Sequence, residues 1–270
     1  MIKSFMDLPP AAKREILANA ALELGMLPEA LEKDIWICHV LGVLFSISGL
    51  PLIVFRGGTS LSKAFNAIDR FSEDIDLTIS HEDILPETSN FFDFSSNKRN
   101  NLLDSLSALL VEILREKIYP LLSEALGIYG KIAFDEQEKM TISFFYNSIL
   151  DVPVNSYINK KVMLEFGGRG GIEPNSVIKI SPYAARLHPE LQFPEPSARV
   201  VSGTRTFWDK VTLIHSEISR FNHRYRDQGL CRVDRNRTLA GDPGLGAGLT
   251  SRIPSSPHRR KPRSNLPHSG

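Results

Sequence analysis

The sequence is poor in cysteine: only Cys38 and Cys231 occur among its 270 residues, and they lie far apart. A disulfide framework or a zinc site built from cysteines needs several suitably spaced thiols, so we expect neither. Low cysteine content is typical of proteins that work in a reducing compartment. We therefore expect a cytoplasmic protein.

The sequence also lacks a continuous hydrophobic run that would cross a membrane. No apolar segment of the signal-peptide type follows the N-terminal Met-Ile-Lys-Ser. The long uncharged stretch 35–55 is interrupted by Ser46, Ser48, Gly49 and Pro51, which favour a turn over a continuous spanning helix. This stretch predicts a buried helix followed by a buried strand, and we expect no membrane association.

The formal net charge of +1 indicates no partner, but the charge is unevenly distributed. Residues 1–221 carry 22 Lys and Arg against 28 Asp and Glu, whereas residues 222–270 carry 10 against 3. The second segment also holds 6 Gly, 5 Pro and one aromatic residue, without apolar periodicity. Such a segment cannot bury enough apolar surface to offset the entropy lost on ordering. We predict a folded domain over 1–221 and a disordered basic tail over 222–270.

Periodicity within residues 1–221 predicts both helices and strands. Apolar residues that recur every three or four positions indicate helices, and short apolar or alternating runs indicate strands. The expected helices cover 11–24, 28–45, 59–68, 100–125 and 206–219, and the expected strands cover 52–55, 74–80, 140–147 and 160–166. The predicted fold class is α+β, a small mixed sheet wrapped by helices.

A glycine pair follows the first apolar strand, in the segment Phe55-Arg-Gly-Gly-Thr-Ser-Leu-Ser-Lys63. Backbone N–H groups at the start of a helix point outward, and glycines let a phosphate approach them closely. The hydroxyls of Thr59 and Ser60 could add hydrogen-bond donors. Lys63 lies too far beyond Gly58 for a phosphate loop that ends in Gly-Lys-Ser/Thr. The segment predicts a phosphate-binding turn of another type.

Two aspartates, Asp74 and Asp76, stand two residues apart on an expected strand, so their carboxylates project from the same face. Paired carboxylates suit Mg²⁺, particularly where a nucleoside triphosphate supplies further oxygen ligands. Glu73 would face the other way and is the weaker candidate. Glu165 ends a later apolar strand and would add a third carboxylate if the two strands are neighbours.

Either pattern alone is more often structural, because glycine turns and solvated Asp-x-Asp strands are common. Here Asp74 follows Gly58 by 16 residues, in a strand–turn–helix–strand context. A phosphate-binding turn beside paired carboxylates indicates metal-dependent phosphoryl or nucleotidyl transfer.

The segments 57–63 (Gly-Gly-Thr-Ser-Leu-Ser-Lys) and 70–77 (Arg-Phe-Ser-Glu-Asp-Ile-Asp-Leu) resemble the nucleotidyltransferase motif of the AbiEii/AbiGii toxin family, within the DNA polymerase beta-like superfamily. Three further segments are similar: Leu31–Trp36, Leu164–Phe166 and Thr206–His215. The resemblance covers residues 15–220. It implies that 1–221 is a nucleotidyltransferase-like domain with the sheet of that superfamily and its site within 50–80.

This resemblance implies a toxin of a type IV toxin–antitoxin or abortive-infection system, encoded beside a cognate antitoxin. The implied reaction moves a nucleoside monophosphate from a nucleoside triphosphate to an acceptor, and tRNA ends are the implied target. By position, the triphosphate would be bound by Gly57, Gly58, Thr59, Ser60 and Lys63. Asp74 and Asp76 would hold Mg²⁺, with Glu165 as the third carboxylate and Lys210 as a further catalytic or phosphate-contacting base.

Spacing alone leaves other interpretations open. Lys210 equally fits an exposed helix lysine that flanks a buried face formed by Phe207, Val211 and Ile214. His215 fits a core histidine better than a site residue. The superfamily scaffold also serves small-molecule nucleotidyltransferases of the antibiotic-modifying type, which are the nearest enzymatic alternative. A nucleic-acid-binding protein that uses its basic tail, or a remnant that binds nucleotide without transferring it, are the alternatives from other classes.

The C-terminal segment departs from the family pattern. Family members continue past the last helix into an Arg-His-Tyr-Tyr-Asp-Leu-like segment and further helix, whereas this chain has 223–231 (His-Arg-Tyr-Arg-Asp-Gln-Gly-Leu-Cys) and then the basic tail. An abrupt loss of amphipathic pattern with a rise in Arg, Pro and Gly is what a wrong reading frame produces. We hypothesise a frameshifted or decayed C-terminus.

The nucleotide sequence of the gene tests this hypothesis. We expect an alternative frame to continue the helical pattern and the Arg-His-Tyr-Tyr-Asp-Leu-like segment beyond Phe221. If neither alternative frame does so, the C-terminus is not the product of a frameshift.

Overall fold

The computed structural model describes residues 3–68, 71, 73–135, 140–150 and 158–227 of the chain. The chain divides into two units, Met1–Ser219 and Arg220–Gly270, and each is taken by itself below. Of the second unit the structure describes residues 220–227, which are helical. The remainder of the expected basic tail, 228–270, lies outside the described residues.

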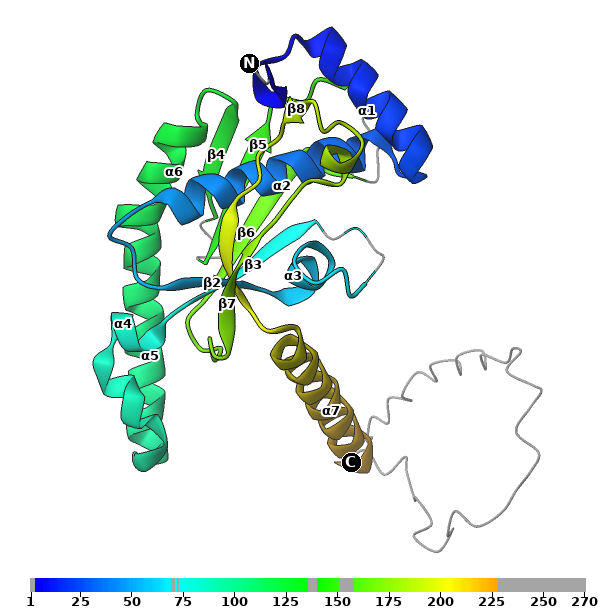
Figure 1. Cartoon of the computed structure of the whole chain (residues 1–270). Coiled ribbons are helices and arrows are strands. Elements are labelled where there is room, and N and C mark those ends of the chain that lie inside the picture. The colour runs from blue at the N-terminus through cyan, green and yellow to red at the C-terminus, as the bar shows by residue number, and fades with distance from the viewer. Residues whose placement is uncertain (1–2, 69–70, 72, 136–139, 151–157, 228–270) are drawn as a thin grey trace, which may run out of the picture. The chain divides into compact units, whose positions relative to one another are not determined.

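The first unit is built on a seven-stranded mixed sheet with the strand order β4-β5-β6-β3-β2-β9-β7 (Figure 1). Parallel pairing joins β3 to β6 and β2 to β9, and the other neighbours are antiparallel. The strands are β2 (Ile53–Arg56), β3 (Asp74–Ile79), β4 (Gly130–Phe134), β5 (Thr141–Tyr146), β6 (Lys161–Gly167), β7 (Asn175–Lys179) and β9 (Ser197–Val201). Two short strands, β1 (Lys3–Ser4) and β8 (Leu191–Gln192), form a separate parallel pair.

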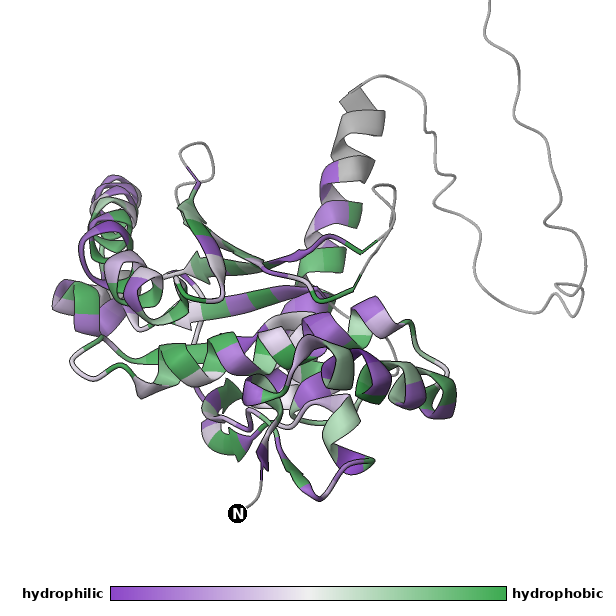
Figure 2. Ribbon diagram, turned by 90° about the horizontal axis from the view of Figure 1, so that it is seen from above, coloured by the Kyte–Doolittle hydropathy of each residue, from purple (hydrophilic) through white to green (hydrophobic). Residues whose placement is uncertain are grey.

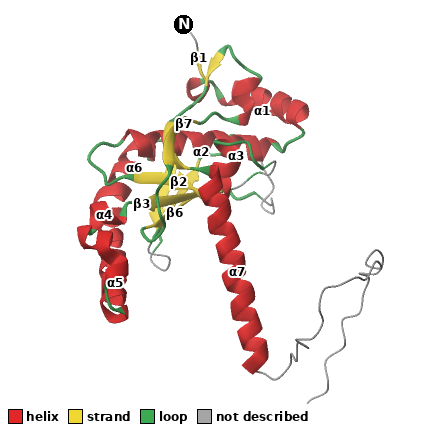
Figure 3. Ribbon diagram, turned by 60° about the horizontal axis from the view of Figure 1, so that its bottom comes forward, coloured by secondary structure: helices red, strands yellow, loops and turns green. Residues whose placement is uncertain are grey.

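Helices surround this sheet (Figure 3). They are α1 (Pro10–Leu24), α2 (Pro28–Ser46), α3 (Gly57–Lys63), α4 (His81–Ile84), α5 (Ser96–Ile113), α6 (Tyr119–Leu126) and α7 (Gly203–Asp227). One π-helical turn, Leu114–Ile118, joins α5 to α6, and 3₁₀ turns cover Phe5–Asp7, Pro86–Asp93 and Tyr183–Arg186. In the part of the chain that the structure describes, no helix combines the length and apolar character needed to span a membrane.

The main hydrophobic core lies between α2, the α5–α6 helix and one face of the sheet. Strand alternation explains this, because Ile75 and Leu77 of β3 point into the core while Asp74 and Asp76 point to the opposite face. Apolar residues, green in Figure 2, accordingly alternate with polar ones along the strands. The sheet face that carries the aspartates is left available for a polar site.

The predicted fold class is confirmed, with helices and a mixed sheet in one unit. Strands β4, β7 and β9 were not expected. Strands β4 and β7 lie at the edges of the sheet and have no fully buried residue, so their apolar signal is weak. The helix expected at 59–68 begins at Gly57 and ends at Lys63. The helix expected at 206–219 extends from Gly203 to Asp227.

Candidate active site beside Asp76

The glycine turn packs directly against one aspartate. Gly57 has φ +78°, and a Cβ atom built on it would lie 1.7 Å from Oδ2 of Asp76. The backbone N–H of Gly58 donates a hydrogen bond to the Asp76 carboxylate. Arg56 and Asp76 are paired across the antiparallel strands β2 and β3. Only glycine satisfies both the backbone conformation and this close contact at position 57.

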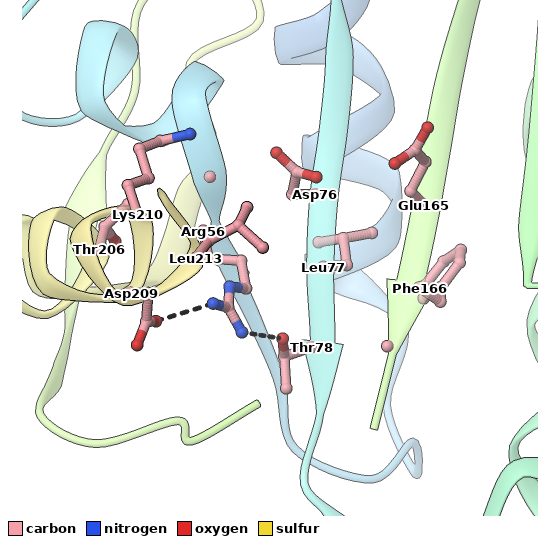
Figure 4. Close-up of a pocket in the computed structure, with 12 residues that line it drawn as sticks. Arg56, Asp76, Leu77, Thr78, Glu165, Phe166, Thr206, Asp209, Lys210 and Leu213 are labelled. Carbon is pink, nitrogen blue, oxygen red and sulfur yellow. Dashed lines mark hydrogen bonds and ion pairs between the residues drawn. The ribbon is translucent and has the colours of Figure 1, made fainter. Parts of the chain in front are cut away.

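The third carboxylate candidate lies next to this aspartate. Strand β6 is the parallel neighbour of β3, and its Glu165 stands in register with Asp76. The condition that the sequence left open, that the two strands are neighbours, is therefore met. Both side chains border the same cavity (Figure 4), whereas Asp74 lies two residues earlier on the same strand face.

This cavity has a volume of about 390 Å³ and is bordered by β2, β3, β6 and α7 (Figure 4). Lys210 reaches it from α7. Thr206, one turn earlier on α7, also borders the cavity; its buried hydroxyl has no hydrogen-bond partner among the residues that the structure describes. The lining chemistry is mixed: Arg56, Gly57, Asp76, Glu165, Asp209 and Lys210.

Arg56 of β2 fastens α7 at this cavity through Asp209, and Arg205 of α7 itself contacts the same carboxylate. Nη2 of Arg56 lies 2.8 Å from Oδ2 of Asp209, and Nε of Arg205 lies 3.0 Å from Oδ1 of the same carboxylate. Arg56 also donates a hydrogen bond to the Thr78 hydroxyl (3.2 Å). A Cβ atom at Gly170 would lie 1.9 Å from Nη1 of Arg56, so the glycine-rich turn after β6 allows this packing.

Arg56, Asp209 and Arg205 were not among the site residues expected from the sequence. Two of these residues adjoin predicted site residues in the sequence: Arg56 precedes Gly57, and Asp209 precedes Lys210. This proximity was the only signal that could have identified them. Their opposite charges were not assigned to each other, because 153 residues separate them in sequence.

The electrostatics of Asp76 follow from its burial. Burial raises the pKa of this carboxyl, and the neighbouring charge of Asp74 raises it further. The positive charges of Lys210 and Arg56 and the hydrogen bond from Gly58 oppose this effect without cancelling it. Burial thus disfavours the charged form of Asp76, and a cation bound beside it would favour that form.

The hydroxyls expected at the phosphate-binding turn are engaged elsewhere. Thr59 donates to the backbone carbonyl of Asp74, and Ser60 donates to that of Gly57 (2.9 Å). Both residues are buried. They connect the start of α3 to β3 and to the glycine turn, and the structure does not bring their side chains to the cavity.

Lys63 and Asp74 also lie apart from the cavity at Asp76. The ammonium of Lys63 is buried in an ion pair with Asp34, 2.7 Å away. Asp74 borders a neighbouring cavity of about 420 Å³ together with Lys33, Glu73 and Lys161. The structure thus gathers Gly57, Asp76, Glu165 and Lys210, with Asp74 on the adjoining side.

The expected buried face of the last helix is wrong. Phe207, Val211 and Ile214 are 55%, 36% and 59% exposed. The helix instead turns Thr206 and Lys210 toward the cavity. Asp209 pairs with Arg56 of β2, so an ion pair joins α7 to the sheet at this cavity.

Comparisons with known proteins give a family match and similar solved structures. A family model described as "Nucleotidyl transferase AbiEii toxin, Type IV TA system" matches residues 44–228. Among solved structures the chain is similar to MenT4, a nucleotidyltransferase toxin from Mycobacterium tuberculosis H37Rv, with 17% sequence identity and a TM-score of 0.40. That match covers 73% of this chain and 55% of the other, so the chain spans just over half of its length. No curated protein sequence matches the chain.

Substitution of Gly57 tests the contact with Asp76. Gly49 has the same φ of +78°, but no atom lies within 4 Å of the place that an alanine methyl would take there, so Gly49→Ala isolates the backbone strain alone. We expect Gly49→Ala to lower the free energy of unfolding by about 1–2 kcal/mol, and Gly57→Ala to lower it further because the carboxylate must move. Urea unfolding of both variants measures the difference; equal losses would contradict a tight contact.

Proposed function

The chain belongs to the AbiEii nucleotidyl transferase toxin family of type IV toxin–antitoxin systems, and from this membership we propose that it transfers a nucleoside monophosphate from a nucleoside triphosphate to an acceptor. The observation that carries the proposal is the cavity where Gly57, Asp76, Glu165 and Lys210 meet. The acceptor proposed is a tRNA end, in the cytoplasm, with an antitoxin encoded beside the toxin.

The carboxylates of the site fit Mg²⁺. In nucleotide sites this ion is held by one or two carboxylates together with substrate phosphates. Asp74 and Asp76 offer such a pair from one strand face, and Glu165 adjoins Asp76. Among the described residues no three His, Cys, Asp or Glu side chains converge on one point, so phosphate oxygens would complete the ligand set. When bound, Mg²⁺ supplies the charge neutralisation that phosphoryl transfer needs.

The other groups of the cavity act on the substrate. Gly57 lets the turn pack against the Asp76 carboxylate, and the proposal places the phosphates at the backbone of Gly57 and Gly58. The ammonium of Lys210 offsets phosphate charge. Arg56 and Asp209 hold α7 so that Lys210 reaches the cavity.

Incubation with tRNA and each labelled nucleoside triphosphate tests the function. We expect label transfer that falls to background in Asp74→Ala/Asp76→Ala, because the carboxylate pair is lost, and that is unchanged in Asp104→Ala, an exposed aspartate of α5. Transfer to small molecules but not to RNA would favour the antibiotic-modifying type of enzyme. Nucleotide binding without transfer would favour a catalytically inactive remnant.

Lys210 gives a separate prediction. Lys210→Met should lower kcat by about 10²–10³-fold, as removal of one group that stabilises transition-state charge does. Lys131→Met serves as the control, because Lys131 is an exposed lysine on β4. Steady-state kinetics with both variants measures the effect. Equal rates for the two variants would show that Lys210 is merely a surface lysine.

A further inference from the structure

Helix α2 carries three consecutive charged residues in its buried part. Glu32, Lys33 and Asp34 are only 5%, 2% and 1% exposed. Charged side chains are almost never this buried unless they are paired. Successive residues of a helix point about 100° apart, so the three side chains reach different parts of the fold.

Asp34 reaches the end of α3. Its Oδ1 lies 2.7 Å from Nζ of Lys63, and its Oδ2 accepts a hydrogen bond from the backbone N–H of Tyr183 (2.7 Å). Lys63 also donates to the carbonyl of Ser181 (2.8 Å), and its Nζ lies 4.0 Å from the centre of the Tyr183 ring. The ammonium of Lys63 is therefore occupied by protein partners, which leaves it no role as a phosphate ligand.

Lys33 reaches the segment that leads into β3. Its Nζ lies 2.6 Å from Oε2 of Glu73, the residue directly before Asp74. Thr59 of α3 in turn donates a hydrogen bond to the backbone carbonyl of Asp74. The start of β3 is thus held both by α2 and by α3.

The Asp34–Lys63 and Lys33–Glu73 ion pairs connect two parts of the site, the glycine turn and the start of β3, to helix α2. Helix α3 has seven residues, from Gly57 to Lys63, and so it spans only about 10 Å. Since Gly57 and Lys63 are the two ends of this one helix, a shift of Lys63 would move Gly57 and hence its contact with Asp76. The Lys33–Glu73 pair fixes Glu73, and a shift of Glu73 would move the adjacent Asp74.

We propose that Lys33 and Asp34 are positioning residues, which act through Glu73 and Lys63 to hold the aspartate pair and the glycine turn in the geometry that binds a metal–nucleotide complex. The proposal rests on the proposed function for the identity of the ligand. In this proposal Lys63 positions the glycine turn through its ion pair with Asp34 and does not contact the triphosphate.

The test compares Asp34→Asn, Lys63→Met and the double variant. Glu32→Gln is the matched control, because Glu32 is equally buried on the same helix but accepts hydrogen bonds from Ser148 and from the backbone of Ile149 instead. Circular dichroism and urea unfolding establish that each variant is folded. Calorimetry with Mn²⁺ and the α,β-methylene analogues of ATP, GTP, CTP and UTP then measures binding without turnover.

We expect Asp34→Asn and Lys63→Met each to weaken binding of the Mn²⁺–nucleotide complex by about 10–100-fold, as loss of residues that orient metal ligands does. The double variant should be no worse than either single variant, because both act through one ion pair. Glu32→Gln should bind like the wild type. Lys33→Met should weaken binding in the same way as Glu73→Gln.

Four results would overturn the proposal. If only Lys63→Met weakens binding, Lys63 contacts the phosphates directly. If the effects of Asp34→Asn and Lys63→Met add, or if Glu32→Gln weakens binding equally, the residues do not act as a specific unit. Wild-type protein that binds the complex but transfers nothing would contradict the proposed function alone, and the binding comparison would still decide this proposal. Wild-type protein that binds no complex would contradict both.

Discussion

The contact between the glycine turn and Asp76 is the constraint on which the site depends. The chain passes from strand β2 to helix α3 at Gly57, and this turn packs against the carboxylate of Asp76 on the adjacent antiparallel strand β3. Gly57 makes this possible because it tolerates φ +78° and has no Cβ. Glu165 joins the group only because β6 pairs in parallel with β3 on its other side.

Ion pairs join the elements around this contact to one another. On one side, consecutive residues of α2 reach Glu73 and Lys63 from within the core. On the other side, Asp209 joins α7 to β2 through Arg56. A buried ion pair adds little net stability, because desolvation offsets most of its attraction. Its directionality, however, holds the elements in one arrangement.

The apolar side chains of α7 illustrate the limit of pattern reasoning. Phe207 and Ile214 have helical spacing, which normally marks a buried face, yet both are more than half exposed. Spacing reports that residues share a face but not which way that face points. Here Thr206 and Lys210, about 100° around the helix from Phe207 and Val211, face the cavity, and the Asp209–Arg56 ion pair joins α7 to β2.

Local physics let the sequence by itself determine much of this protein: the α+β class, the glycine turn and the Asp74/Asp76 pair on one strand face. These features depend on neighbours in sequence, through strand alternation and glycine conformation. The partners of Lys63 and Asp209, the adjacency of Glu165 and the orientation of α7 were decided only by the tertiary structure. Each of them requires residues far apart in the chain to meet, and no local pattern encodes which distant charge a lysine or an aspartate will find.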